Sequence, residues 1–232
     1  VPLVLIGTVK SCTTLPITDA MNVTLLNPPL VSQRGDFLGS GIPYLPHGLV
    51  YLATVLQNRH DVTVIDMFGE KPEQVVAAGR YVIQGLTLKE LLARVDKRTE
   101  CFCVYAGSVM AATMLEQTVS ALKAASPNVP LIVFENTQAV TGFSLEHALT
   151  RLAASGVDYV VTGESETRVP QILDMLGDGQ GSLPDGVWQC RGELSEGCAP
   201  AGVIEALDDL PFPAWNLLPL ENYWRLGYAH GP

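Results

Sequence analysis

The sequence predicts an α/β fold, a Rossmann-like or flavodoxin-like open parallel sheet of five strands with helices on both faces, followed by an extended strap. Three observations lead to this prediction. Strand-like and helix-like segments alternate through residues 21–177. Four of the five strand-like segments are near-continuous apolar runs, as in strands buried on both faces, and the helix-like segments carry one apolar stripe. With 47% hydrophobic residues, a chain of 232 residues can bury a core.

The five predicted strands are short runs rich in β-branched and apolar residues, each bounded by turn residues. They cover residues 21–27, 61–66, 100–106, 131–134 and 157–162. The first ends at Pro28-Pro29, which cannot donate to a sheet ladder. Right-handed crossovers between such strands leave few topologies, and the flavodoxin-like sheet is the simplest.

The predicted helices show apolar residues at spacings of three and four. They are centred on residues 49–56, 88–95, 111–122, 145–152 and 169–176. The second helix also has a start signal, because Thr87 and Glu90 have the spacing of a capping box.

Three parts of the chain are expected to differ in organisation. Residues 1–20 form a lead-in, residues 21–177 the sheet domain, and residues 178–232 a small hairpin and a linker. The hairpin would pair residues 187–190 with 203–204, and the Pro-rich stretch 207–219 would be an extended strap towards another domain. Because the chain lacks an initial Met and a closing element, we expect an excerpt of a longer protein.

Composition argues against several classes of partner. The net charge is −10 and no Lys/Arg cluster occurs, so no nucleic-acid partner is expected. No apolar run reaches the roughly 18 residues of a membrane span, so no membrane partner is expected. Five cysteines without a framework spacing favour a reducing, cytoplasmic compartment.

Ligands of open parallel sheets bind at the carboxyl ends of the strands, so the loops there are the candidate site. Three stand out: the long connection 27–48, the small residues Gly107-Ser108, and the turn 163–167 with two glutamates. Each also has a structural explanation, namely a strand end, a tight turn or a favourable helix start. The histidines show no metal-ligand spacing, and no phosphate loop or nucleophile elbow occurs. No catalytic or metal-binding residue is assigned.

Four ordered motifs resemble the N-terminal cobalamin-binding domain of B12-dependent radical SAM enzymes. They are Asn27-Pro-Pro, the helix segment 42–56 (IPYLPHGLVYLATVL) with the strand 62–66, the turn 163–166 (GESE), and the connector 207–224. The resemblance covers about residues 21–224.

The resemblance implies a methyltransferase-like protein in which this domain holds cobalamin at the carboxyl edge of the sheet. It implies that the nucleotide tail runs beside Gly107 and Ser108. S-adenosylmethionine and a [4Fe-4S] cluster would belong to a C-terminal radical SAM barrel, the expected partner, which would act on a small-molecule or peptide substrate. The implied cofactor-binding residues are Asn27, Pro28, Pro29, Leu45, Pro46, Gly107, Ser108, Val109, Glu135, Asn136, Thr137, Gly163, Glu164, Ser165 and Glu166.

Two departures from the family pattern keep alternatives open. Phe134-Glu135 stands where the family usually has a Gly-Gly turn, and the cluster-binding cysteine motif is absent. The main alternative is a degenerate scaffold or substrate-docking domain of the same lineage that does not bind B12. A flavodoxin-like module for another nucleotide cofactor is a weaker alternative, because the chain has no dedicated phosphate-binding motif.

Overall fold

The structure is a computed structural model that describes residues 20–36, 43–135, 144–179, 181–190 and 202–225. Its main sheet has six strands in the order β3-β1-β6-β7-β8-β9. The first five are parallel and occupy the predicted positions, so the flavodoxin-like α/β fold is confirmed. The six strands of the sheet are β1 (Asn22–Asn27), β3 (Asp61–Asp66), β6 (Cys101–Ala106), β7 (Leu131–Glu135), β8 (Tyr159–Val161) and β9 (Val187–Gln189).

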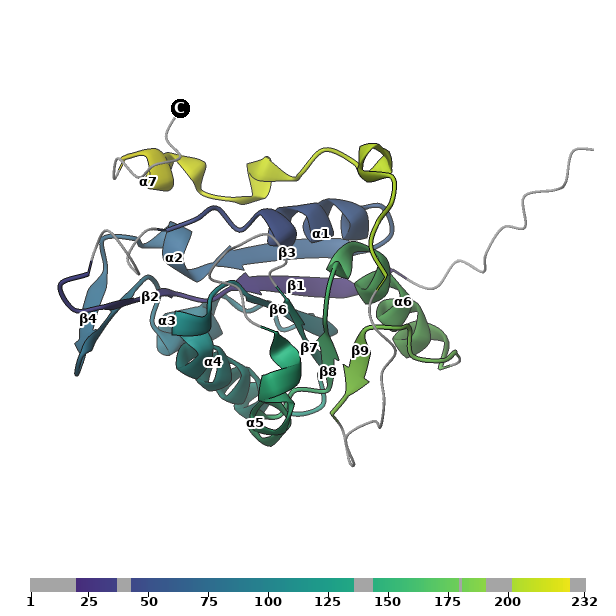
Figure 1. The fold of residues 1–232 in the computed structure, drawn as a ribbon, viewed down its shortest axis with the longest axis horizontal. Helices are drawn as coiled ribbons and strands as arrows, with labels where there is room; N and C mark the ends of the chain where they lie inside the picture. Colours follow the sequence, from purple (N-terminus) through teal and green to yellow (C-terminus); the bar gives the residue numbers. More distant parts are fainter. Residues whose placement is uncertain (1–19, 37–42, 136–143, 180, 191–201, 226–232) are drawn as a thin grey trace, which may run out of the picture.

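Helices cover both faces of this sheet, as predicted (Figure 1). The α-helices are α1 (His47–Gln57), α2 (Met67–Glu70), α3 (Leu88–Arg94), α4 (Ala112–Ala125), α5 (Leu149–Ser155), α6 (Ser165–Asp178) and α7 (Leu220–Arg225). Single 3-10 turns are η1 (Val109–Ala111), η2 (Leu145–Ala148), η3 (Leu207–Asp209) and η4 (Trp215–Leu217). The capping box of α3 forms as expected between Thr87 and Glu90.

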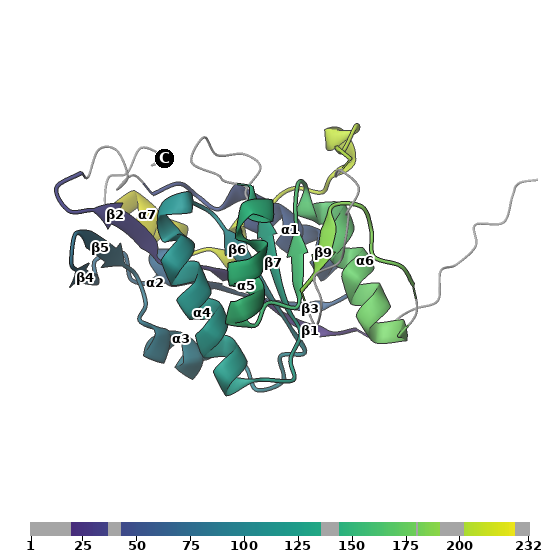
Figure 2. The same cartoon turned by 60° about the horizontal axis from the view of Figure 1, so that its bottom comes forward.

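Two hydrophobic cores lie on the two faces of the sheet, because successive residues of a strand point to opposite sides. In β6, Cys103 and Tyr105 belong to the core under α1 and α6, whereas Phe102 and Val104 belong to the other core. That second core is closed by α4 and α5, which lie together over one face in Figure 2. All six β6 residues are buried, in keeping with the apolar run in the sequence.

The sheet departs from the prediction at its far edge. A sixth strand, β9, adds to β8 in the antiparallel direction and pairs Val160 with Trp188. The expected hairpin between residues 187–190 and 203–204 is therefore wrong, since 187–189 pair with β8 and 202–204 form no strand. Pairing with an already folded sheet buries Val187 almost completely, which an isolated hairpin would not do.

A second, antiparallel sheet in the order β2-β5-β4 was not predicted. Its strands are β2 (Leu30–Gln33), β4 (Val75–Ala78) and β5 (Tyr81–Gln84). The strand β2 lies inside the connection 27–48, directly after the buried Pro28 and Pro29, so the first part of that loop is ordered.

Residues 202–225, here called the C-terminal segment, run back over the domain along α1 to α2 (Figure 1). Ala214 and Leu218 are buried in the core under α1. The Ala214 N–H donates to the carbonyl of Val50, and the Thr54 hydroxyl donates to the carbonyl of Phe212 at 3.0 Å. The stretch expected to be an extended strap is thus part of this domain's packing.

Candidate functional site

The carboxyl ends of β1 and β6 form the switch point of the sheet, where chain connections leave in opposite directions. Asn27 ends β1, Asp66 ends the neighbouring β3, and Gly107 follows β6. A β-carbon placed on Gly107 would lie 3.9 Å from the Asn27 side-chain oxygen, so these two predicted residues are brought together.

Asp66 is the centre of a buried polar network at this edge. Its Oδ1 accepts N–H groups from the Asn27 amide at 2.8 Å and from the Gly69 backbone at 3.0 Å. Its Oδ2 accepts the Tyr223 hydroxyl at 2.7 Å. The carboxyl is only 1% exposed, and this burial raises its pKa in spite of the three donors.

The short helix α2 holds Asp66 and the C-terminal segment together. A β-carbon on Gly69 would lie 2.3 Å from the Asp66 Oδ2 and 2.6 Å from the Tyr223 ring, so only glycine leaves room for both. The Asn222 amide donates to the Gly69 carbonyl at 2.8 Å, and Phe68 contacts the Tyr223 ring edge-on. The far end of the segment is therefore anchored at the switch point.

Tyr105 is buried near the carboxyl end of β6, directly below the loops of the candidate site. β-Carbons on Gly48 and on Gly107 would each lie 3.3 Å from its ring, so the two glycines pack against opposite sides of the phenol. Phe134 contacts the same ring at 5.3 Å between centroids and is fully buried. Burial raises the pKa of Tyr105, and the nearby Glu166 adds to the effect. Phe134 therefore points into the core rather than across the edge.

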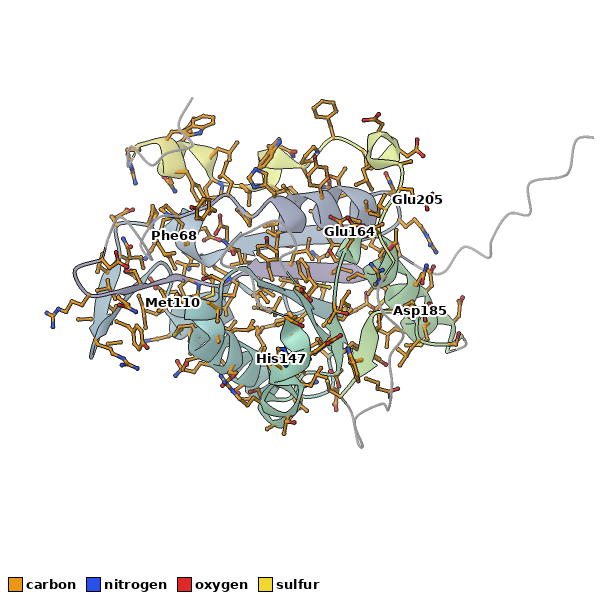
Figure 3. The ribbon with its side chains drawn as sticks, viewed as in Figure 1. Phe68, Met110, His147, Glu164, Asp185 and Glu205 are labelled. Carbon is orange, nitrogen blue, oxygen red and sulfur yellow. The ribbon has the colours of Figure 1, made fainter. Side chains whose placement is uncertain are left out.

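The predicted turn at Gly163 anchors the near end of the C-terminal segment. Gly163 has a φ of +70°, which favours glycine, and the next residue caps α6. The Glu164 carboxylate accepts the Ile204 N–H. Arg168, one helical turn on, donates to the carbonyls of Glu164, Asp185 at 2.8 Å and Gly202 at 2.5 Å. Figure 3 places Glu164, Asp185 and Glu205 on this side and Phe68 and Met110 at the opposite end.

Two other predicted glutamates are also held by main-chain groups. Glu135, half-buried at the end of β7, bonds to the backbone N–H groups of Gly163 and Leu145, and burial raises its pKa. Glu166 is 8% exposed, bonds to backbone N–H groups at the start of α6, and also has its pKa raised by burial. Glu135 thus joins neighbouring loops of the carboxyl edge, whereas Glu166 bonds within the start of its own helix.

The remaining predicted residues occupy varied places. Ser108 is half-buried and its hydroxyl accepts the Met110 N–H at 3.2 Å, while Val109 is 49% exposed. Leu45 packs against the core and Pro46 precedes α1. Ser165 is buried at the start of α6, and Asn136 and Thr137 lie outside the described residues.

Sequence reasoning missed Tyr105, Arg168 and Tyr223 as partners of this edge. Arg168 alone had a local signal, since it follows Glu164, the N-cap of α6, by four residues, although its bond goes to the Glu164 backbone carbonyl. Tyr223 bonds to Asp66, 157 positions earlier in the chain, and no local sequence pattern predicts such a contact.

A hollow of about 340 Å³ lies at the opposite end of the sheet, at the amino ends of β1 and β3. Its lining includes His60, whose Nδ1 accepts the Met21 N–H and whose Nε2 has no partner among the described residues. Burial lowers the pKa of His60. Thr24 and Thr99 in the same hollow bond to each other at 2.8 Å, so part of its polar lining is internally satisfied.

Within the described ranges, no group of three His, Cys, Asp or Glu side chains is placed to hold a metal ion. No helix in that part of the chain has the length and apolar content needed to cross a bilayer.

Comparison with known proteins gives one distant sequence relative. No family model matches the chain. An uncharacterized methyltransferase of Pyrococcus horikoshii is 28% identical over 214 residues, covering 91% of this chain and 42% of the relative. The chain thus spans less than half the length of that protein. Among solved structures, the isolated REC domain of RcsB from Salmonella enterica serovar Typhimurium matches with a TM-score of 0.41 and 14% identity over 72% of this chain and 94% of that one.

Proposed function

We propose that this chain is the cobalamin-binding domain of a methyltransferase of the B12-dependent radical SAM kind. The observation that carries the proposal is the meeting of Asn27, Gly107 and the buried Asp66 network at the switch point of a flavodoxin-like sheet. The Pyrococcus relative named as a methyltransferase supports the reaction class. S-adenosylmethionine, a [4Fe-4S] cluster, the barrel that binds them and its substrate belong to the same proposal for the longer protein.

The residues at the edge fit such a cofactor in three respects. Phe134 is withdrawn into the core, so it does not crowd the loop after β7. Gly107 and Ser108 are small and partly exposed. The Ser32 hydroxyl of β2 is fully buried without a hydrogen-bond partner among the described residues, on a strand that packs against η1 after β6.

In this proposal the chain's residues bind and orient the cofactor. Asn27, Gly107 and Ser108 line the edge, and the main chain beside the small residues offers polar groups to the cofactor's amide arms. Bound cobalamin supplies a transferable methyl group, while the protein contributes position and a dry surface. No described side chain is assigned acid–base chemistry.

A direct test is to titrate the purified chain with hydroxocobalamin and then desalt it. We expect retained colour with shifted visible bands, and a binding isotherm by calorimetry before desalting. Ser108→Trp should abolish retention by filling the space beside Gly107. Ser182→Trp, the same change at an exposed position, should retain cobalamin. A folded wild-type chain without a binding isotherm would contradict the proposal.

That negative result would favour the second candidate, a scaffold or docking domain of the same lineage that does not bind B12. One observation supports this alternative: Asn27, Glu135 and Glu164 already have partners within the protein. Polar groups whose bonds are complete contribute less to recognising a ligand.

A further inference from the structure

The Asn27 side chain is held at the edge of the sheet by its hydrogen bond to Asp66. The Asp66 Oδ1 accepts two N–H groups, from Asn27 and from Gly69. A proton on the Asp66 carboxyl would therefore sit on Oδ2, the oxygen that meets Tyr223. In either protonation state Oδ1 is an acceptor, so Asn27 must turn its amide nitrogen towards Asp66.

Tyr223 holds the other oxygen of the same carboxyl. Its hydroxyl donates to the Asp66 Oδ2 at 2.7 Å, and both residues are buried, Asp66 at 1% and Tyr223 at 2% exposure. Burial raises the pKa of this phenol well above its ordinary range, and the Asp66 carboxyl adds to the rise. The carboxyl that accepts the Asn27 N–H is therefore held at both of its oxygens.

The Asn27 carbonyl oxygen is left on the outer side. It lies next to Gly107, 3.9 Å from the place that a β-carbon would take there, and Asn27 itself is only half-buried. A side-chain amide whose nitrogen donates inward to Asp66 turns its carbonyl oxygen, an acceptor, towards the edge.

We infer that Tyr223 is a positioning residue that, through Asp66, fixes Asn27 as a hydrogen-bond acceptor facing the edge, so that the bound group must present a donor there. This inference rests on the proposed function and specifies it: an amide N–H₂ arm of the cofactor meets Asn27, and a carboxylate at that position would be rejected. Docking of α7 and ligand binding are then coupled, each favouring the other by the same factor.

The experiment combines a ligand-free measurement with a titration. By ¹⁵N NMR, the Asn27 side-chain proton that bonds to Asp66 should exchange slowly with solvent in the wild-type chain and much faster in Tyr223→Phe. By calorimetry, Tyr223→Phe should raise the dissociation constant for hydroxocobalamin about five- to tenfold, the size of one lost hydrogen bond to an oriented group. Tyr81→Phe removes a hydroxyl that has no hydrogen bond to any residue the structure describes, and it should change neither quantity.

Fast exchange of this Asn27 proton in the wild type would overturn the inference, and so would unchanged affinity of Tyr223→Phe. A wild type that binds no hydroxocobalamin would overturn the proposed function, and the amide-proton measurement would then decide the positioning role alone. Asn222→Ala, which releases α7 from the Gly69 carbonyl, provides a second variant with the same expected direction should Tyr223→Phe not fold.

Discussion

The C-terminal segment is anchored to the domain at two points, which differ in whether the domain or the segment supplies the side chains. At the near anchor, the Glu164 and Arg168 side chains of the domain bind main-chain atoms of Gly202 and Ile204. At the far anchor, the Asn222 and Tyr223 side chains of the segment bind the domain. The near anchor therefore tolerates almost any side chain in the segment, because it binds main-chain atoms. The far anchor depends on the identity of the segment's residues, because their side chains make the bonds.

The largest expected effect comes from breaking the near anchor with Arg168→Met. The guanidinium is buried and donates to three carbonyls, and an apolar side chain of similar length leaves all three without that partner. We expect a loss of about 3 kcal/mol in the free energy of unfolding, measured by urea denaturation. The control, Arg34→Met at an exposed turn, should change stability by less than about 0.5 kcal/mol. A loss below about 1 kcal/mol for Arg168→Met would contradict the importance given to this anchor.

A single methyl group distinguishes the two anchors. Gly69→Ala places a β-carbon 2.3 Å from the Asp66 Oδ2, against two buried groups, and should cost about 2 kcal/mol while α7 detaches. Gly202→Ala meets nothing within 4 Å and should be nearly neutral, although Gly202 is itself part of the near anchor. Hydrogen exchange of the amides in 220–225 reports the detachment. Equal protection of these amides in both variants would show that the far anchor is not sterically defined.

The pH dependence of stability tests the electrostatics of the far anchor. Burial raises the pKa of Asp66 in the folded chain, so the folded state binds more protons than the unfolded state above the ordinary carboxyl range. Its contribution is fully present below the unfolded pKa and is lost as pH rises through the folded pKa, at a rate of at most about 1.4 kcal/mol per pH unit. Denaturation from pH 3.5 upward should therefore show a smaller decline for Asp66→Asn than for the wild type. Parallel curves would mean that Asp66 does not titrate differently in the two states.

Between the anchors, the smallest effect is expected for Phe212→Ala. This side chain is 92% exposed and the segment is held there through the Phe212 carbonyl, so stability should stay within about 0.5 kcal/mol. Leu218→Ala, by contrast, removes a side chain that is 7% exposed and should cost about 2 kcal/mol, with both variants measured by urea denaturation. A large effect at Phe212 would point to contacts of the segment outside the described residues.

The sequence pattern was sufficient for the parallel strands because each is a short apolar run with a helix of clear period after it. It was insufficient for the second sheet, although β4 and β5 are β-rich runs separated by Gly79-Arg80, a two-residue hairpin signal. The direction of β9 follows from an open sheet edge that only the assembled fold provides.

The site was predictable to the extent that it lies on strand ends. Asn27, Gly107 and Gly163 were singled out from their positions after predicted strands, and the structure brings Asn27 and Gly107 together. The full network around Asn27 was not predictable, because its partner Asp66 also bonds to Tyr223, which lies 157 positions further along the chain. Cofactor binding by these residues stays a prediction.

The Tyr223–Asp66 hydrogen bond also sets an order of events during synthesis. A ribosome releases the chain from its N-terminus, so β1, β3 and β6 can pair long before residue 223 emerges. Until then the Asp66 carboxyl lacks the cover of Tyr223, whose ring otherwise packs against Phe68 and Gly69. Closing a loop of 157 residues costs little more entropy than closing a shorter one, but it delays this contact to the end. The buried network at the switch point is therefore completed only after the strands that surround it have been synthesised.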